Sequence, residues 1–543
     1  MSSTTPRYAA LAGFTAATVA IGSAELVAVS TGPRSAPLVA VGGLVVDTVP
    51  EPLKQLGITL FGTYDKIALL VGTALLLGGV AAVLGMLAVR RLAVGLTGIA
   101  AFALLGVVAA LTRAGADPAD ALPSLVGGGL GALTLWAFVA GPLELDPWPW
   151  SPPTPADAAA TPTQPIPADA AAAAPQPPPA SGARAGAGPE SRRRFLTGVG
   201  TLLGAATVGG LTGRWLAGRR GVSAAREAVV LPAPVSAAPP VPPGADLGPT
   251  PVASYVTSNN AFYRIDTALV VPQVDPATWR LRVHGRVRNP IELSYADLLA
   301  RPMVERYVTL ACVSNEVGGD LIGNARWLGV PIRELLDEAQ PLDGADQVVG
   351  RSVDGWTCGT PTAALRDGRD ALLAVGMNGE PLPVEHGFPV RMVVPGLYGY
   401  VSACKWVTEL ELTSFADFDA YWVPRGWSEQ APVKTQSRID TPRPRNRLTA
   451  GEVVVAGVAW AQRRGISQVE VRVDGGPWQR ATLAPTVSVD TWVQWSWRWP
   501  ATVGEHTLQV RATDRDGETQ TARRSPVAPD GATGWHTVEV TVR

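Results

Sequence analysis

The sequence predicts a multidomain protein with an N-terminal helical transmembrane region, an α+β domain and a C-terminal all-β sandwich. Residues 1–217 are rich in Ala, Leu, Val and Gly, whereas nearly all aromatic and most charged residues lie beyond them. From Tyr255 onward the pattern is that of a globular domain. From about Val433, short segments of alternating apolar and polar residues are separated by turn signals, which is typical of a sandwich.

Composition excludes several classes of function. The formal net charge of the 543-residue chain is -1, so no basic field favours nucleic acid, and no nucleic-acid motif is present. The three cysteines, Cys312, Cys358 and Cys404, are too few for a disulfide scaffold and lack zinc-finger spacing. All four histidines lie in the second half. Haem ligation by histidine within the membrane is therefore excluded.

Several apolar segments approach the 20 or so residues needed to cross a bilayer. Four predicted spans and a shorter fifth are Tyr8–Val29, Ile67–Val89, Leu92–Leu111, Pro123–Gly141 and Phe195–Leu211. Pro37–Val46 is apolar but too short, and we interpret it as interfacial or re-entrant. Intramembrane charge is nearly absent, so the spans are interpreted as an anchor or docking surface, with a quinone or partner-protein site as the alternative.

Basic residues flanking the spans predict their orientation. Arg90 and Arg91 join the second and third spans and should be cytoplasmic, which places Asp47 and Glu51 outside. The fourth span then returns the chain to the cytoplasm. The linker that follows, 144–190, is dominated by Pro and Ala and cannot bury a core.

The linker ends at a basic cluster, Ser191-Arg192-Arg193-Arg194-Phe195-Leu196, before the fifth span. This run resembles a twin-arginine export signal, here internal rather than N-terminal. The alternative is an ordinary positive flank. The export pathway carries folded, cofactor-loaded proteins, and after four spans the signal starts on the cytoplasmic side.

In the globular half, Trp279–His284 alternates as a half-buried strand, Ser294 can cap a short helix, and Ile332–Ala339 is an amphipathic helix. The run Val308–Gly319 delivers Cys312 from a β-rich stretch into a turn with a glycine pair. From spacing alone, Cys312 is a small buried hydrophobe or a catalytic nucleophile in need of a histidine.

Three separated stretches together resemble the sulfite-oxidase superfamily of molybdopterin enzymes. The first is Asn259-Asn260-Ala261-Phe262-Tyr263-Arg264, and the second is the Cys312 run continuing to Trp327-Leu328-Gly329-Val330-Pro331. The third joins Met377–Pro383, His386-Gly387-Phe388-Pro389-Val390-Arg391, Pro395-Gly396 and Lys405-Trp406. The order and spacing fit over roughly Val252–Thr413.

The resemblance implies one molybdenum held by the dithiolene of molybdopterin and by Cys312 as thiolate ligand, a soft donor suited to this metal. The implied reaction is two-electron oxygen-atom transfer on a small substrate. Cofactor-binding residues carried over from the motifs are Asn260, Arg264, Asp354, His386, Arg391 and Lys405, and Arg264 also lies where the family lines its substrate pocket. Arg391 and Lys405 match anion-binding positions, and His386 is expected to hydrogen-bond the pterin.

One departure concerns the substrate. The family's Arg-Asn-His becomes Arg264-Ile265-Asp266 here, and a carboxylate should weaken binding of sulfite or nitrate. We see no fused haem domain, so a separate redox partner, a cytochrome or a quinone-linked protein, is expected. The alternatives are an S- or N-oxide reductase acting in repair and a metal-free exported scaffold.

The resemblance also implies that the C-terminal domain is immunoglobulin-like and can form a homodimer. Cys358 and Cys404 are either a disulfide or separate buried thiols. The chain is expected in the cytoplasmic membrane, multi-pass, with its catalytic domain extracytoplasmic. The predicted domains are four spans in 1–143, the linker 144–190, the signal and fifth span 191–217, a Pro-rich spacer 218–250, the molybdopterin domain 251–425 and the sandwich 426–543.

Overall fold

The computed structural model describes residues 5–49, 53, 60–61, 65–113, 116–145, 189–219, 221–248 and 251–543, so most of the predicted linker lies outside the described residues. The chain divides into two compact units, Met1–Arg220 and Gly221–Arg543. The longer helices of the first unit are α1 (Thr5–Thr31), α2 (Pro37–Thr48), α4 (Asp65–Ala88), α5 (Leu92–Leu111), α6 (Leu122–Ala140) and α8 (Pro189–Arg219).

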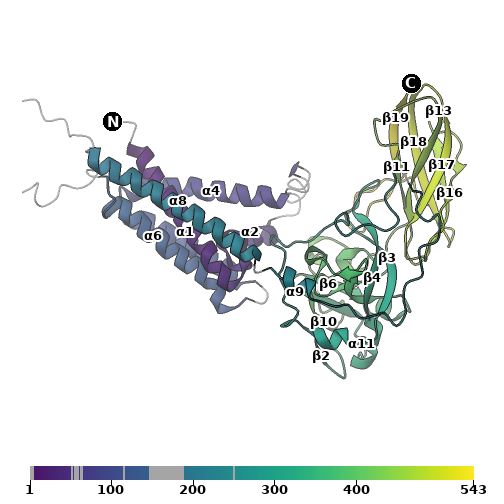
Figure 1. Cartoon of the computed structure of the whole chain (residues 1–543), viewed down its shortest axis with the longest axis horizontal. Helices are drawn as coiled ribbons and strands as arrows, with labels where there is room; N and C mark the ends of the chain where they lie inside the picture. The colour runs from purple at the N-terminus through teal and green to yellow at the C-terminus, as the bar shows by residue number, and fades with distance from the viewer. Residues whose placement is uncertain are drawn as a thin grey trace, which may run out of the picture. The chain divides into compact units, whose positions relative to one another are not determined.

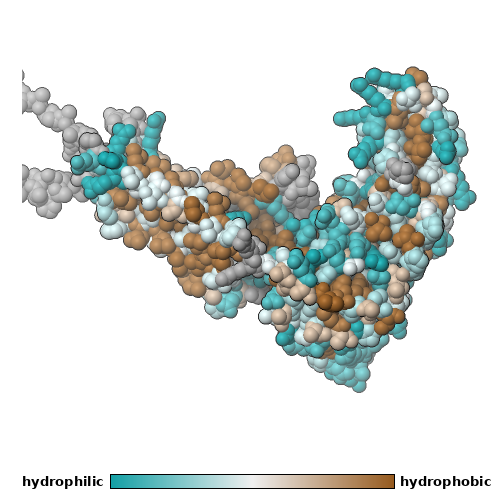
Figure 2. Space-filling model, viewed as in Figure 1, coloured by the Kyte–Doolittle hydropathy of each residue, from teal (hydrophilic) through white to brown (hydrophobic). Residues whose placement is uncertain are grey.

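The first unit is a bundle in which α1 packs against α4, α6 and α8 (Figure 1). Small residues permit this packing: a Cβ on Gly13 would lie 2.0 Å from the carbonyl oxygen of Ala81 in α4. Hydrophobic side chains cover much of the bundle's outer surface (Figure 2), and Leu75, Leu104 and Val208 are each more than 60% exposed. Such a surface is typical of a bundle surrounded by lipid rather than water.

Five described helices are long and apolar enough to cross a membrane: Pro6–Thr31, Lys66–Ala88, Leu92–Leu111, Pro118–Ala140 and Glu190–Leu216. They coincide with the five predicted spans. The last is longer than expected, because α8 begins at Pro189 and includes the arginine cluster that we predicted to precede the span as an export signal.

The second unit contains the α+β domain and the sandwich, as predicted. The helices of the unit are α9 (Ser223–Glu227), α10 (Tyr295–Leu299), α11 (Ile332–Ala339) and α12 (Thr362–Arg366). The strands are β1 (Arg280–Gly285), β2 (Ile291–Ser294), β3 (Val304–Ala311), β4 (Ile322–Pro331), β5 (Gln347–Ser352), β6 (Thr357–Pro361), β7 (Leu372–Met377), β8 (Glu380–Pro381), β9 (Arg391–Val393), β10 (Val407–Thr413), β11 (Gln436–Thr441), β12 (Arg447–Leu448), β13 (Gly451–Trp460), β14 (Ile466–Val473), β15 (Gln479–Arg480), β16 (Thr482–Leu483), β17 (Val493–Ala501), β18 (Gly504–Asp514) and β19 (His536–Val542).

The α+β domain is built on two sheets. One has the strand order β2-β1-β10-β5-β6, and the other has β3-β4-β7-β8 with β9 paired to β7. Ser294 caps α10, as predicted. The Asp297 N–H donates to Ser294 Oγ at 3.1 Å, and the Ser294 N–H donates to Asp297 Oδ2 at 2.9 Å. The predicted helix Ile332–Ala339 is α11. Strand β3 lies at the edge of its sheet and ends one residue before Cys312.

The C-terminal domain packs the sheet β11-β13-β17-β16 against β12-β19-β18-β14-β15. The predicted turn Asp474-Gly475-Gly476 follows β14, with positive φ at Asp474 and Gly475. Of the alternating tryptophans on β17, Trp495 and Trp499 are buried in the core between the sheets, and Trp497 packs against it while only partly buried. The Trp-rich strand β17 therefore contributes to the core of the sandwich.

Two of the three tryptophans of β17 allow a matched test of this core. Trp495→Ala should lower the free energy of unfolding by about 3–5 kcal/mol, because it removes a fully buried aromatic side chain. Trp497→Ala should lower the free energy of unfolding clearly less, because Trp497 is only partly buried. Denaturant unfolding of the full chain in detergent, followed by circular dichroism, measures both, and equal losses would contradict this assignment of the core.

Candidate molybdopterin site

Cys312 lies at the end of β3, where the chain leaves the sheet. Its backbone N–H donates to the Leu321 carbonyl at 2.9 Å, and its own carbonyl accepts from Asn315 N–H at 3.1 Å. The thiol is buried, and this burial raises its pKa, while donors from Ser314 and Val313 act in the opposite direction. The thiol thus has donors in place that would stabilise a thiolate.

The outer edge of β3 is held by the C-terminal domain. The Thr309 N–H donates to the Asp490 carbonyl at 2.9 Å, and Gln462 Nε2 donates to the Thr309 carbonyl at 2.9 Å. The Trp492 N–H donates to Thr309 Oγ1 at 2.8 Å. We did not predict these supporting residues, and nothing in their local sequence indicates the role.

The turn after Cys312 also contacts the C-terminal domain. Gly318 has φ +82°, and a Cβ there would lie 2.2 Å from the imidazole of His536. Arg438 Nη1 donates to the Gly319 carbonyl at 2.7 Å. Gly318 of the predicted glycine pair is therefore required by close packing between two domains, as well as by its positive φ in the turn.

Arg391, at the start of β9, is a buried cation. Its guanidinium donates to the carbonyls of His386, at 3.1 Å, and Met392, at 3.3 Å, and lies 5.0 Å from the centre of the Trp327 ring. We find no carboxylate paired with it among the described residues. Burial lowers its pKa to about 10. A bound anion would remove the electrostatic cost of this charge.

Lys405, Asp266 and Arg264 form a second charged group. Asp266 Oδ2 lies 2.8 Å from Lys405 Nζ and 2.7 Å from Arg264 Nε. The side chain of Asp266 is 5% exposed and that of Arg264 is 38% exposed. Burial lowers the pKa of Lys405 to about 8 although Asp266 acts in the opposite direction. Arg264 is thus the accessible cation, and Asp266 already neutralises part of its charge.

His386 occupies a 3₁₀ turn, Val384–His386, and is buried. Its Nε2 lies 2.9 Å from the Asn259 carbonyl, which can only accept, so Nε2 carries a hydrogen. Burial, and then the charge of Arg391, lower the pKa of His386 to about 4. The side chain is therefore neutral at neutral pH.

Tyr263 belongs to the first motif but was not assigned a role from the sequence. Its ring stacks on Phe262 with centroids 5.2 Å apart. Burial raises the pKa of its hydroxyl, with a further contribution from Cys312 and an opposing one from Arg391. Tyr263 is therefore close to both the thiol and the buried guanidinium. Its position immediately before Arg264 is the sequence feature that could have identified Tyr263 as a site residue.

Two of the predicted cofactor-binding residues, Asn260 and Asp354, have fewer contacts with the other predicted site residues. Asn260 is exposed, and we find no hydrogen bond of its side chain in the described part of the chain; the neighbouring Asn259 contacts His386 instead. Asp354 forms the predicted turn, accepting from Trp356 N–H at 3.2 Å. Its charge raises the pKa of Cys404, so it lies near the residue that precedes Lys405.

Cys358 and Cys404 are free, buried thiols. They are neighbours, because a hydrogen bond from Cys404 lowers the pKa of Cys358. Cys358 Sγ also lies 3.9 Å from Met392 Sδ. Cys358 therefore lies against Met392 of β9, and Cys404 immediately precedes Lys405 in the chain.

The structure brings Cys312, His386, Arg391, Lys405 and Arg264 into one cluster. The charge of Arg391 acts on His386 and Lys405, that of Arg264 acts on Lys405, and Cys312 and Arg391 both act on Tyr263. Nowhere in the described ranges do three His, Cys, Asp or Glu side chains gather as a protein-only metal site requires. A metal at Cys312 would take the remainder of its ligands from a cofactor. A buried thiol fits a metal held by a phosphate-bearing dithiolene pterin when it lies near two buried cations, a guanidinium without a carboxylate partner in the described residues and an ammonium only partly compensated by Asp266.

Comparisons with known proteins agree with this arrangement. The family model described as "Oxidoreductase molybdopterin binding domain" matches residues 268–422, and "Bacterial Ig domain" matches residues 436–510. The chain is 30% identical to "Sulfite oxidase" from Gallus gallus over 52% of this chain and 72% of that protein. It is 31% identical to "Sulfite oxidase, mitochondrial" from Rattus norvegicus over 53% of this chain and 62% of that enzyme.

A third relative, "Uncharacterized oxidoreductase YuiH" from Bacillus subtilis (strain 168), is 34% identical over 28% of this chain and 74% of its own length. The matches to the chicken and Bacillus proteins cover more than two thirds of each relative, and the family model covers the cluster from Cys312 to Lys405. The chain therefore belongs to the sulfite oxidase family and is a molybdopterin-dependent oxidoreductase.

Proposed function

We propose that the protein catalyses two-electron oxygen-atom transfer on a small substrate, with Cys312 as the thiolate ligand of molybdenum. The observation that carries the proposal is a buried thiol within a cluster of buried cations. When bound, the molybdenum cofactor supplies the exchange of an oxygen atom and two electrons. The chain's own residues bind that cofactor, orient it and control which substrates approach.

Arg391 and Lys405 would bind the pterin phosphate. Arg391 is the stronger candidate, because its planar guanidinium can bind phosphate through two hydrogen bonds and it lacks a carboxylate partner among the described residues. His386 is neutral with its Nε2 hydrogen directed at the Asn259 carbonyl, which leaves the other ring nitrogen as an acceptor for a pterin N–H. Asn260 and Asp354 complete the proposed lining.

Arg264 would contact the substrate, and Asp266 would influence which substrate binds. Because Asp266 pairs with both Arg264 and Lys405, the accessible positive charge is smaller than in a site without this carboxylate. This arrangement favours neutral substrates over divalent anions. It supports the second candidate function, reduction of S- or N-oxides, over oxidation of sulfite.

The exterior of the first unit supports insertion in the cytoplasmic membrane, since five helices have suitable length and composition. The positions of Arg90–Arg91 and Arg192–Arg194 favour a cytoplasmic linker and an extracytoplasmic catalytic domain exported in the folded state. Electrons would pass to or from a separate cytochrome or quinone-linked protein. The C-terminal domain would provide the contact for a homodimer.

The buried charges of the site argue against the alternative of a metal-free exported scaffold. Such a scaffold would have no use for the buried charges of Arg391, which has no carboxylate partner in the described residues, and of Lys405, which Asp266 compensates only in part. Both charges lower the stability of the cofactor-free fold.

Cys312→Ser tests the ligand assignment. The variant should fold normally but lose molybdenum. Losing a residue that only orients a metal ligand lowers activity roughly 10–100-fold. Because Cys312 is proposed to be a ligand itself, turnover with artificial electron carriers should fall by more than that. Elemental analysis and pterin fluorescence measure cofactor content. The control is Cys358→Ser, the same change at a buried thiol outside the cluster. A fully active Cys312→Ser protein would refute the assignment.

Asp266→Asn tests the control of substrate charge. Removing this negative charge should tighten inhibition by sulfate roughly tenfold, as expected for one partly buried charge, while KM for a neutral S-oxide stays the same. Asp417→Asn, at the surface pair with Arg286, is the matched control. If sulfate inhibits wild type and Asp266→Asn equally, Asp266 does not set the charge preference.

His386 predicts a pH dependence of stability in cofactor-free protein. Its folded-state pKa of about 4 lies below the unfolded value of about 6.5, so its contribution is complete above pH 6.5 and decreases as pH falls toward 4. The loss should reach about 2–3 kcal/mol. His386→Gln should flatten this part of the curve of unfolding free energy against pH. The pH dependence that remains in this variant would come in part from His536, whose pKa is also lowered to about 4.

A further inference from the structure

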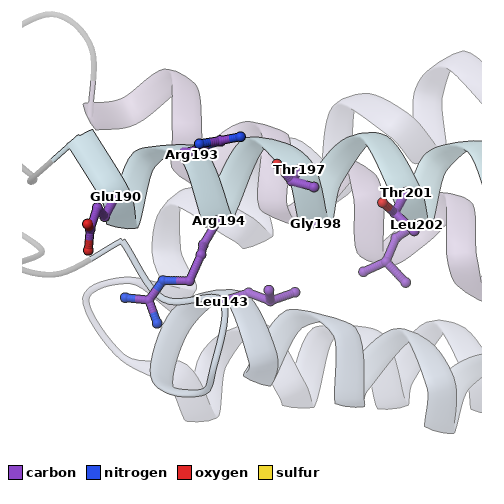
Figure 3. A pocket seen from close by; sticks show the side chains of 8 residues that line it. All are labelled: Leu143, Glu190, Arg193, Arg194, Thr197, Gly198, Thr201 and Leu202. Atoms are coloured by element: carbon purple, nitrogen blue, oxygen red, sulfur yellow. The ribbon is translucent and has the colours of Figure 1, made fainter.

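A hollow of about 670 Å³ lies where α8 begins and the chain leaves α6. Figure 3 shows its lining: Leu143, Glu190, Arg193, Arg194, Thr197, Gly198, Thr201 and Leu202. The basic residues are at the start of α8, and the apolar and hydroxyl side chains follow along the helix. The hollow therefore has a charged end and a less polar end.

Packing fixes which face of α8 meets the rest of the bundle. Phe195 is fully buried, with ring centroids 5.0 Å from Phe138 and 5.6 Å from Tyr8. Arg192 lies over the Tyr8 ring at 5.8 Å. Because these residues anchor one face of α8 in the bundle, Arg193 and Arg194 are left exposed. Neither makes an ion pair within the described part of the chain.

We propose that this hollow binds one anionic phospholipid. The guanidinium groups of Arg193 and Arg194 would hold the phosphodiester, and an acyl chain would lie along Leu143, Gly198 and Leu202. The hydroxyls of Thr197 and Thr201 can donate to headgroup oxygens. Glu190 reduces the formal charge of the lining to +1, two arginines against one glutamate. The positive end of the α8 dipole adds to the attraction.

This inference rests on the proposed membrane insertion, which places the charged end at the cytoplasmic headgroup level. At that level, basic pockets between helices are suited to anionic headgroups, whereas a zwitterionic lipid would gain little from two arginines. A soluble phosphate would share the charged end but would leave the apolar end unfilled. We therefore assign a lipid rather than a free anion.

The test uses the full chain in detergent. Native mass spectrometry measures retention of phosphatidylglycerol and of phosphatidylcholine with the same acyl chains. Wild type should retain one phosphatidylglycerol in preference to phosphatidylcholine. The double variant Arg193→Gln with Arg194→Gln should bind it about 30-fold more weakly, the effect expected for two basic residues at an anionic surface. Arg193→Lys with Arg194→Lys should lose much less, because it preserves both charges.

Two controls separate the possible failures. Arg90→Gln with Arg91→Gln removes an equal charge from the turn between α4 and α5, outside the hollow, and should leave retention unchanged. Equal losses in this control, or displacement of the lipid by water-soluble glycerol phosphate at equal concentration, would overturn the site. Carbonate extraction from native membranes tests insertion separately. Release by carbonate overturns both proposals, whereas retention without a preference for phosphatidylglycerol overturns only the lipid site.

Discussion

The position of the Cys312 thiol depends on the hydrogen bonds made by both edges of β3. One edge pairs with β4 along the whole strand, and the other is bonded at Thr309 by the carbonyl of Asp490 and the amide of Gln462. An edge strand without such partners would expose polar groups and move more freely. The C-terminal domain therefore acts as part of the site, although it contributes no residue that we expect to bind the cofactor.

The charges around this thiol carry an energetic cost. Arg391 and Lys405 are buried, and their lowered pKa values, about 10 and about 8, reflect the loss of solvent. Asp266 compensates Lys405 only in part. A fold selected for stability alone would avoid such charges, so their retention is best explained by an anion bound in the mature protein. Stability and cofactor binding are thus coupled in the same residues.

Much of this architecture follows from local sequence. Apolar length predicted the five long helices, alternation predicted β1 and the short strands of the sandwich, and Ser294 predicted the cap of α10. The motifs also identified Cys312, His386, Arg391 and Lys405, which the structure brings together. Contacts between distant segments could not be predicted, because no periodicity encodes them. The support of Thr309 by Gln462, the double pairing of Asp266 and the proximity of Cys358 to Cys404 all belong to this class.

The contact between Gly318 and His536 links the loop after the thiol to the first residue of the last strand. The imidazole occupies the volume that any side chain at position 318 would need. Substitutions at either position must accordingly be accommodated by both domains at once. We expect the two positions to change together, if at all, during evolution of related chains. Replacing the C-terminal domain by one from a distant relative would disturb the loop even if every cofactor-binding side chain were kept.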